Sequence, residues 1–352
     1  MYYNTNTLLR QILCISCLIV TGMMSTVQAI DFGEEDFMSF EKSFSSPMVH
    51  DPVMIKQEDT YYLFSTGWGI QVMSSKDMKL WKKERAVFSK APEWAVQMVP
   101  GFKGHIWAPD IIFYQGQYHL FYSCSAFGKN TSAIGHATTP TLNPEDSDFK
   151  WTDHGMIIQS VPNRDHWNAI DPNVIVDEEG TPWMSFGSFW DGIKLVKLAK
   201  DMSAISEPEE WYSICRRNYR PVRDNYTEAN DNAVEAPFIM RHEGFYYLFV
   251  SFDYCCQGEK SNYKIAVGRS GSVTGPYRDR EGRSLSAGGG TILLQGNEQW
   301  AGVGHCAAYQ FAGKDYLVAH GYYIPQEGVS KLVLREISWD EEGWPVVNIV
   351  LK

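Results

Sequence analysis

A fivefold internal repeat constrains the fold of this chain more than any other feature of its sequence. Five aromatic-rich segments recur along the chain: Thr60–Ser65, Gln117–Ser123, Thr181–Gly187, Phe245–Ser251 and Lys314–His320. Aligned on one shared aliphatic position, they contain Leu63, Leu120, Met184, Leu248 and Leu317, at steps of 57, 64, 64 and 69 residues. Self-similarity at a period of this kind is typical of radial or solenoidal folds.

Each repeat predicts a set of short β-strands. The first repeat contains the runs Pro52–Lys56, Tyr61–Phe64, Ile70–Ser74 and Trp81–Phe88. These runs are rich in Val, Ile, Tyr, Phe and Trp, and Gly, Asp and Ser turns separate them, which is the pattern of strands. Four short strands per unit make one propeller blade. The sequence therefore predicts an all-β, five-bladed propeller with its active site at the central axis and with long loops.

A second pattern lies twelve or thirteen residues before each shared aliphatic position. The residues there are Asp51, Ala108, Asp171, Glu235 and His305. The first strand of a propeller blade lines the central channel, so a residue at its start should face the axis. A single Asp would be explained as a turn residue. Three carboxylates and a histidine at one register favour convergence into a site.

The composition limits the possible partners. The chain has 31 Lys and Arg and 42 Asp and Glu, which gives a net charge of −11. Proteins that bind nucleic acids or anionic membranes usually present a basic surface. We therefore expect no nucleic-acid partner. The apolar content of 44% is ordinary for a globular protein, and no linker interrupts the repeat. We expect one propeller domain over residues 48–352 that acts as a monomer.

The N-terminus predicts a secretory signal peptide. Ile12–Val20 is an apolar run too short to span a bilayer, and Val27 and Ala29 provide small residues for cleavage after Ala29. Residues 1–29 would be the signal and 30–47 a lead-in segment. The mature chain is then secreted or periplasmic, without membrane insertion. A retained anchor is the lesser alternative, and lipoprotein anchoring is disfavoured because no Leu stands three positions before Cys14 or Cys17.

The cysteines predict no disulfide framework. Outside the signal they are Cys124, Cys215, Cys255, Cys256 and Cys306. Their odd number and irregular spacing fit neither a disulfide scaffold nor a zinc site. The favoured interpretation is that they are small buried residues.

Two carboxyl groups that flank a glycosidic bond can hydrolyse it, one as a proton donor and the other ionised. Glu235 has apolar neighbours in the sequence, which favour the protonated form of a carboxyl, so it is the predicted general acid. Asp51 follows the polar His50 and is the predicted general base. Asp171 is predicted to tune and orient the acid.

The chain resembles glycoside hydrolase family 43, and within it the α-1,5-L-arabinanases. The motifs that carry the resemblance extend from about residue 48 to residue 345. They are His50–Pro52, Trp107–Asp110, Ser132–Gly135, Asn168–Asn173, Phe186–Trp190, Val234–Pro237, Val267–Ser270 with Thr274–Tyr277, and Gly302–His305. The resemblance implies an inverting, acid/base cleavage of arabinan, with Asp51, Glu235 and Asp171 in the roles given above.

The same resemblance implies further site residues. It places a mostly water-coordinated calcium ion beside His305, and it places Trp107 and Phe127 along the sugar subsites. Calcium prefers six to eight oxygen ligands, so an imidazole alone would leave most of the shell to water. Asn168 and Ser188 carry polar groups near Asp171 that could bind sugar hydroxyls. We expect no organic cofactor.

Several alternatives stay open at this stage. Endo action is the first expectation, but an inserted loop such as 84–100 or the basic loop 206–232 could block one end of the groove and impose exo action. Another family 43 activity, an α-L-arabinofuranosidase or a β-xylosidase, would keep the fold and change the substrate. A non-catalytic sugar-binding propeller would not need the carboxylates at the axis.

Overall fold

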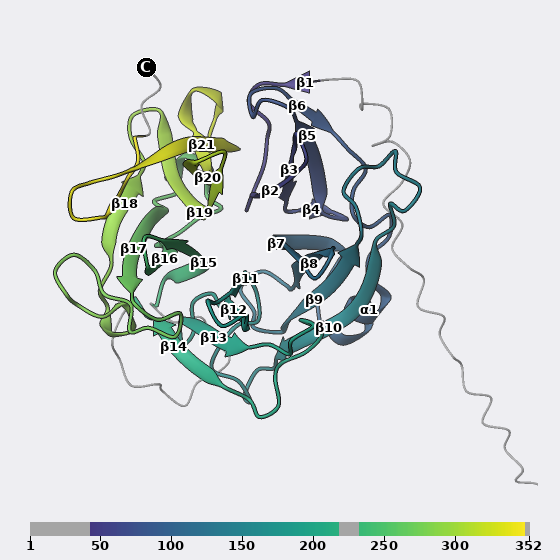
Figure 1. Cartoon of the computed structure of the whole chain (residues 1–352), viewed down its shortest axis with the longest axis horizontal. Helices are drawn as coiled ribbons and strands as arrows, with labels where there is room; N and C mark the ends of the chain where they lie inside the picture. Colours follow the sequence, from purple (N-terminus) through teal and green to yellow (C-terminus); the bar gives the residue numbers. More distant parts are fainter. Residues whose placement is uncertain (1–42, 218–231, 349–352) are drawn as a thin grey trace, which may run out of the picture.

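The computed structural model describes residues 43–217 and 232–348, and within them five antiparallel sheets surround a central axis (Figure 1). This confirms the predicted all-β propeller with five blades. The predicted signal peptide, most of the lead-in segment and part of the basic loop 206–232 lie outside the described residues. No helix in the described part of the chain is long and apolar enough to cross a membrane.

The strands follow the sequence order blade by blade, except that one short strand between two strands of blade 1 joins blade 2. Blade 1 contains β1 (Ser43–Phe44), β2 (Val53–Gln57), β3 (Thr60–Ser65), β5 (Gln71–Ser75) and β6 (Trp81–Lys83). Blade 2 contains β7 (His105–Tyr114), β8 (Gln117–Cys124), β9 (Ser132–Thr139) and β10 (Thr152–Ser160), with β4 (Gly67–Trp68) paired to β7. Blade 3 contains β11 (Asn173–Val176), β12 (Pro182–Phe186), β13 (Ile193–Lys197) and β14 (Trp211–Cys215).

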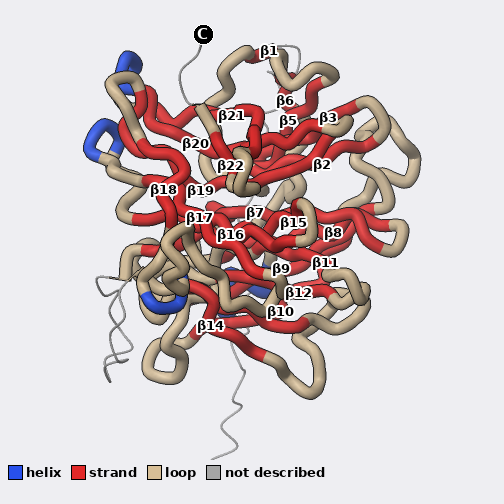
Figure 2. Tube along the Cα trace, turned by 60° about the vertical axis from the view of Figure 1, so that its left-hand side comes forward, coloured by secondary structure: helices blue, strands red, loops and turns tan. Residues whose placement is uncertain are grey.

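Blades 4 and 5 complete the ring. Blade 4 contains β15 (Val234–His242), β16 (Phe245–Phe252), β17 (Lys264–Ser270) and β18 (Thr291–Gln295). Blade 5 contains β19 (Trp300–Phe311), β20 (Lys314–Tyr323), β21 (Val329–Trp339) and β22 (Pro345–Val346). The helices are short: α1 (Glu93–Met98), and the 3₁₀ turns η2 (Gly258–Lys260), η3 (Leu285–Ala287) and η4 (Ile324–Gln326). Figure 2 shows strands dominating the tube, with the helical turns small and scattered.

The shared aliphatic residues lie on the second strand of each blade and are almost fully buried. Their exposed fractions are 1% for Leu63 and 0% for Leu120, Met184, Leu248 and Leu317. The innermost strands, β2, β7, β11, β15 and β19, surround the axis (Figure 1). The repeat therefore reflects one packing requirement, repeated five times: an apolar side chain in the middle of each blade.

A second repeated feature bends the backbone at the axis. Among the non-glycine residues with a left-handed backbone, one in each blade lies in or just before the innermost strand, and these residues are Asp51 (φ 53°), Ala108 (φ 42°), Asp171 (φ 58°), Ala236 (φ 54°) and His305 (φ 47°). In blades 2, 4 and 5 this residue lies at a bulge inside the first strand, not at its start as the sequence suggested. Blade 4 places Ala236 at the repeat position, and Glu235 is one residue earlier.

The left-handed residues are tied to the preceding blade by their backbone N–H groups. In four blades the acceptor is the side chain three positions after the shared aliphatic residue. These bonds are Ala108 to Thr66 Oγ1 (2.8 Å), Asp171 to Ser123 Oγ (3.0 Å), His305 to Ser251 Oγ (2.8 Å) and Asp51 to His320 Nδ1 (3.1 Å). In blade 3 the equivalent position is Gly187, and the Asp171 carboxylate accepts the Ala236 N–H instead, at 3.1 Å. The fold thus fixes where each axis side chain begins.

Blade 5 is joined to blade 1 by bonds of the same kind and by two more. Besides the Asp51–His320 bond, Ser330 Oγ donates to the Val49 carbonyl at 2.6 Å, and the Leu332 N–H donates to the Pro47 carbonyl at 3.1 Å. These contacts bring residues more than 250 positions apart to one side of the axis, where Asp51 begins blade 1.

Candidate active site

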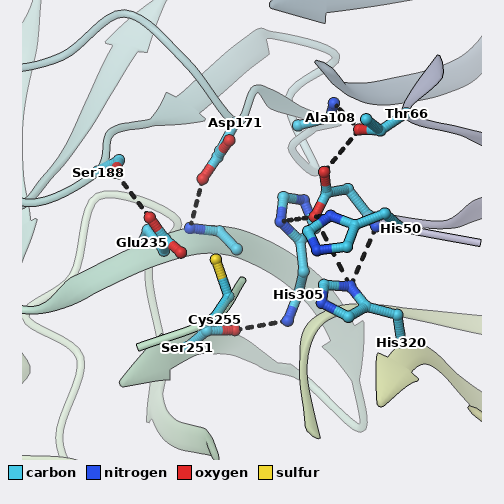
Figure 3. Close-up of polar contacts among 12 residues, drawn as sticks. His50, Thr66, Ala108, Asp171, Ser188, Glu235, Ser251, Cys255, His305 and His320 are labelled. Carbon is cyan, nitrogen blue, oxygen red and sulfur yellow. Dashed lines mark hydrogen bonds and ion pairs between the residues drawn. The ribbon is translucent and has the colours of Figure 1, made fainter. Parts of the chain in front are cut away.

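Asp51 has more hydrogen-bonding side-chain partners than the other two axis carboxylates, and Figure 3 labels these partners, Thr66, His50 and His305. Its Oδ2 accepts from Thr66 Oγ1 at 2.6 Å, while its Oδ1 lies 2.8 Å from His50 Nδ1 and 3.0 Å from His305 Nδ1. Burial by itself would raise the pKa of Asp51, but the His305 and His50 imidazoles outweigh burial and hold the pKa well below its usual range. Asp51 is therefore ionised at neutral pH, as a general base must be.

Asp171 has the opposite electrostatic environment. It is 6% exposed, and its Oδ2 accepts only the backbone N–H of Ala236 among the bonds described here. Burial is the main cause that raises the pKa of Asp171 well above its usual range. His305 lowers this pKa, whereas the negative charges of Glu235 and Asp51 raise it. A carboxyl that resists ionisation beside Glu235 fits the tuning role predicted from the sequence.

Glu235 lies between two hydroxyl donors. Ser188 Oγ donates to Oε2 at 2.7 Å, and Tyr263 OH donates to Oε1 at 2.8 Å. Glu235 is only partly buried, whereas Val234 and Ala236 are buried at 0% and 1%. The predicted apolar surroundings of its carboxyl are therefore wrong in detail, because successive residues of a strand point to opposite faces. The structure leaves Glu235 the most accessible of the three acids.

His305 appears in the same close-up as Asp171 and Glu235 (Figure 3), and its Nδ1 contacts the Asp51 carboxylate. Burial would lower the pKa of His305, but Asp51, and beyond it Asp171 and Glu235, raise it to about 9. With Nδ1 bonded to Asp51, Nε2 is the nitrogen left to ligate a metal, and it can do so only after losing the proton that the raised pKa favours. The donor set therefore does not form a calcium cage, which needs six to eight oxygens, and it fits only an ion that water mostly coordinates.

The predicted sugar-contacting residues differ in their surroundings. Phe127 is 81% exposed, which is unusual for an aromatic side chain and suits a ligand surface. Trp107 is half-buried and its Nε1 donates to His105 Nδ1 at 3.1 Å, so it is not a core residue. Both side chains come from the blade 2 region, from β7 and from the loop after β8.

Asn168 and Ser188 belong to the interior of the protein. Asn168 is 3% exposed and its Oδ1 accepts from Ser132 Oγ at 2.6 Å, which in turn pairs with Ser125 at 2.7 Å. Ser188 is 5% exposed, and its hydroxyl donates a hydrogen bond to Glu235. In this structure Ser188 therefore orients the predicted acid, and Asn168 links the loop before β11 to the start of β9.

Sequence reasoning missed several residues that hold the carboxylates. Thr66 and His320 contact Asp51, and Tyr263 contacts Glu235. Thr66 and His320 follow the shared aliphatic position by three residues, in their respective blades, so the repeat itself contained the signal for them. Tyr263 precedes β17 and has no equivalent signal in the repeat.

The cysteine prediction was wrong for two residues. Cys255 and Cys256 form a disulfide between adjacent positions, whereas Cys124, Cys215 and Cys306 are free and buried as expected. The disulfide lies beside the site, since the Cys256 sulfur is 3.8 Å from His50 Nε2. Two adjacent cysteines show no spacing pattern that is typical of disulfides, so this pairing could not be predicted from the sequence.

The arrangement can perform acid/base chemistry on a substrate at the axis. An ionised carboxylate (Asp51), a more accessible carboxyl held by two donors (Glu235) and a buried carboxyl that resists ionisation (Asp171) meet from three different blades. When the environments of neighbouring carboxyls give them different pKa values, one can serve as the acid and another as the base.

Comparison with known proteins gives concordant results. An extracellular exo-α-(1→5)-L-arabinofuranosidase of Cellvibrio japonicus is 50% identical over 300 residues, covering 85% of this chain and 86% of that protein. An extracellular endo-α-(1→5)-L-arabinanase of Bacillus subtilis is 42% identical over 305 residues, covering 86% and 88%. The structure of a Cellvibrio cellulosa α-L-arabinanase complexed with arabinohexaose matches with a TM-score of 0.84 at 49% identity, covering 86% of this chain and 96% of that one. The family model for glycosyl hydrolases family 43 matches residues 40–345, and the chain belongs to this family.

Proposed function

We propose that this protein hydrolyses α-1,5-L-arabinofuranosidic bonds of arabinan by a single-displacement, inverting mechanism. The observation that carries the proposal is the separation of the axis carboxyls into an ionised Asp51 and an accessible Glu235 held by two donors. Family 43 membership and relatives that are named for α-1,5-arabinan support the choice of substrate.

In the proposed reaction Glu235 gives its proton to the leaving glycosidic oxygen. Asp51 accepts a proton from the water that attacks the anomeric carbon from the opposite face. The donors from His305, Thr66 and His50 hold Asp51 ionised before the reaction. After the reaction Asp51 has gained one proton and Glu235 has lost one. Exchange with solvent returns both groups to their starting protonation states.

We also propose that Nε2 of His305 holds a mostly hydrated calcium ion. When bound, the ion would supply positive charge beside the three acids. The test is calcium titration by calorimetry with the parent and with His305→Ala. Stoichiometric binding that the variant loses supports the proposal, and binding that is absent from the parent or equal in both proteins contradicts it.

The test of the function is a time course of the mature protein on linear α-1,5-arabinan, with products resolved by chain length. Endo action, the first expectation, predicts early release of mixed oligosaccharides. The 50% identical relative named as an exo-enzyme favours the second candidate, in which one short product appears from the beginning. No products from folded protein would contradict both.

Two variants separate catalysis from sugar binding. Asp51→Ala and Glu235→Ala should each lower kcat by about 10²–10⁴-fold while the protein stays folded, since a positioned acid or base contributes this much. Persistent binding of arabino-oligosaccharides by Glu235→Ala would show that the site still forms. If the parent binds the sugar without cleaving it, the protein is a carbohydrate-binding propeller. Secretion is predicted by the N-terminal segment, and relatives named extracellular support it.

A further inference from the structure

The disulfide between Cys255 and Cys256 lies in the loop after β16, at the edge of the candidate active site. Cys255 is half-buried and Cys256 is exposed, so the bond is accessible to solvent. Its sulfurs lie within 4.8 Å of a ring nitrogen of His50. Figure 3 shows Cys255 in the same close-up as Glu235, His50 and His305. The acid/base chemistry proposed above does not use this bond.

A continuous series of hydrogen bonds runs from the disulfide to Asp51. The Cys256 backbone N–H donates to the Tyr322 hydroxyl oxygen at 2.7 Å. The same hydroxyl lies 2.9 Å from His50 Nε2. The other nitrogen of that imidazole, Nδ1, lies 2.8 Å from Asp51 Oδ1. Three steps therefore connect the disulfide loop of blade 4 with the predicted general base of blade 1.

An ionised Asp51 carboxylate can only accept, so His50 Nδ1 donates to Asp51 Oδ1 and carries the proton of the neutral ring. In that tautomer Nε2 is an acceptor, so the Tyr322 hydroxyl, whose oxygen accepts the Cys256 N–H, can donate its hydrogen to His50 Nε2. A neutral imidazole that accepts at Nε2 carries its proton on Nδ1. That proton is then donated to Asp51 Oδ1, where it holds one carboxylate oxygen in place. A hydrogen bond made by one ring nitrogen commonly sets the role of the other.

We propose that the Cys255–Cys256 disulfide is a positioning element of the active site, which orients Asp51 through Tyr322 and His50. The inference rests on the proposed role of Asp51 as the general base. The covalent bond confines the loop so that the Cys256 N–H faces Tyr322, with Cys256 in a left-handed backbone of φ 67°. A residue without the bond would leave this unfavourable conformation more readily.

Reduction of the disulfide is the perturbation that tests this directly. A water-soluble phosphine converts the disulfide into two thiols, while the phosphine is oxidised to its oxide with one oxygen from water. Among the described residues the other cysteines, Cys124, Cys215 and Cys306, are already free and buried. The phosphine therefore acts on a single bond there, and thiol labelling with mass spectrometry confirms that it has opened.

The expected result is a kcat on arabinan that falls about 10-fold, because a general base displaced by a fraction of an ångström loses part of its contribution. KM should stay within about twofold, since no sugar contact is removed. Reoxidation should restore kcat. An unchanged kcat in fully reduced protein overturns the proposal, and a rise in KM alone overturns it too, because that result would identify a sugar-contacting wall.

Two variants test the route. Tyr322→Phe removes the hydroxyl that links Cys256 to His50, so it should lower kcat by itself, and reduction should then cause no further loss. Losses that multiply in the reduced Tyr322→Phe protein overturn the route through Tyr322. The matched control is the double variant Cys255→Ser with Cys256→Ser, which should have the kcat of the reduced parent and should not respond to the phosphine.

A measurement without substrate keeps this inference separate from the proposed function. Long-range ¹⁵N–¹H spectra of histidine-labelled protein report which nitrogen of His50 carries its proton. The Nδ1–H form should predominate in the oxidised protein, and both tautomers should appear after reduction. An identical tautomer in both states overturns the inference even if the enzyme is active. An inactive parent whose His50 responds to reduction contradicts only the proposed function.

Discussion

The Thr66 hydroxyl performs two tasks at once, which makes Thr66→Val an informative perturbation. Its oxygen accepts the Ala108 N–H at 2.8 Å, and its hydrogen is donated to Asp51 Oδ2 at 2.6 Å. Valine has nearly the same shape as threonine, so it removes both hydrogen bonds without leaving a large cavity. One bond joins blade 1 to blade 2, and the other holds the predicted base.

The two losses have different magnitudes. Ala108 is 1% exposed, and a buried donor left without a partner costs about 1–3 kcal/mol. A hydrogen bond to a charged acceptor contributes about 1.5–3 kcal/mol. Asp51 keeps its two histidine partners, so we expect a net destabilisation of about 2–4 kcal/mol in the free energy of unfolding. The looser carboxylate should lower kcat by about 10–100-fold, since 1.4 kcal/mol corresponds to a factor of ten.

Urea unfolding gives the change in stability, and initial rates on linear arabinan give kcat. Thr66→Ser is the matched control, because serine keeps both hydrogen bonds and should stay within about 1.5 kcal/mol of the parent. The reasoning is refuted if Thr66→Val is as stable and as active as Thr66→Ser. A variant that loses stability but keeps kcat would show that Thr66 only joins the blades.

Three further outcomes are expected. Ser188→Ala removes a donor to Glu235 and should lower kcat/KM about 10-fold, with little change in Tm, in initial-rate and thermal measurements. Phe127→Ala should raise KM about 10-fold and leave stability within about 0.5 kcal/mol, because the exposed ring contributes only when sugar covers it; an unchanged KM would remove Phe127 from the subsites. Burial lowers the pKa of His136 from 6.5 to about 3, so the unfolded chain binds more protons between these values, and stability should fall as pH drops from about 6.5 to 3. Urea unfolding at several pH values checks this, and His136→Phe should flatten the dependence.

The sequence was sufficient to predict the blades because their repeat follows from packing. The shared aliphatic residues are nearly inaccessible, and a period of about 60 residues has few other structural explanations. The same register brought Asp51, Asp171 and His305 to the axis with matching left-handed backbones. Glu235 was found as well, although Ala236 occupies the equivalent backbone position.

The surroundings of these residues were harder to predict from the sequence. Apolar neighbours in the sequence suggested a buried Glu235, but the strand turns them to the other face, and Asp171 is the more buried acid. The hydrogen bond from Ser188 to Glu235 was not predicted either. The Cys255–Cys256 bond depends on a local loop conformation that no periodicity encodes.

The measurement that tests the central claim most directly is the configuration of the sugar when it is first released. Early proton NMR spectra of linear α-1,5-arabinan with fresh enzyme distinguish the anomers before they equilibrate. Asp51 as base and Glu235 as acid in a single displacement predict that the β-anomer of the new reducing end appears first. Initial release of the α-anomer would mean two displacements through a covalent intermediate, and it would contradict the roles assigned to these two carboxyls.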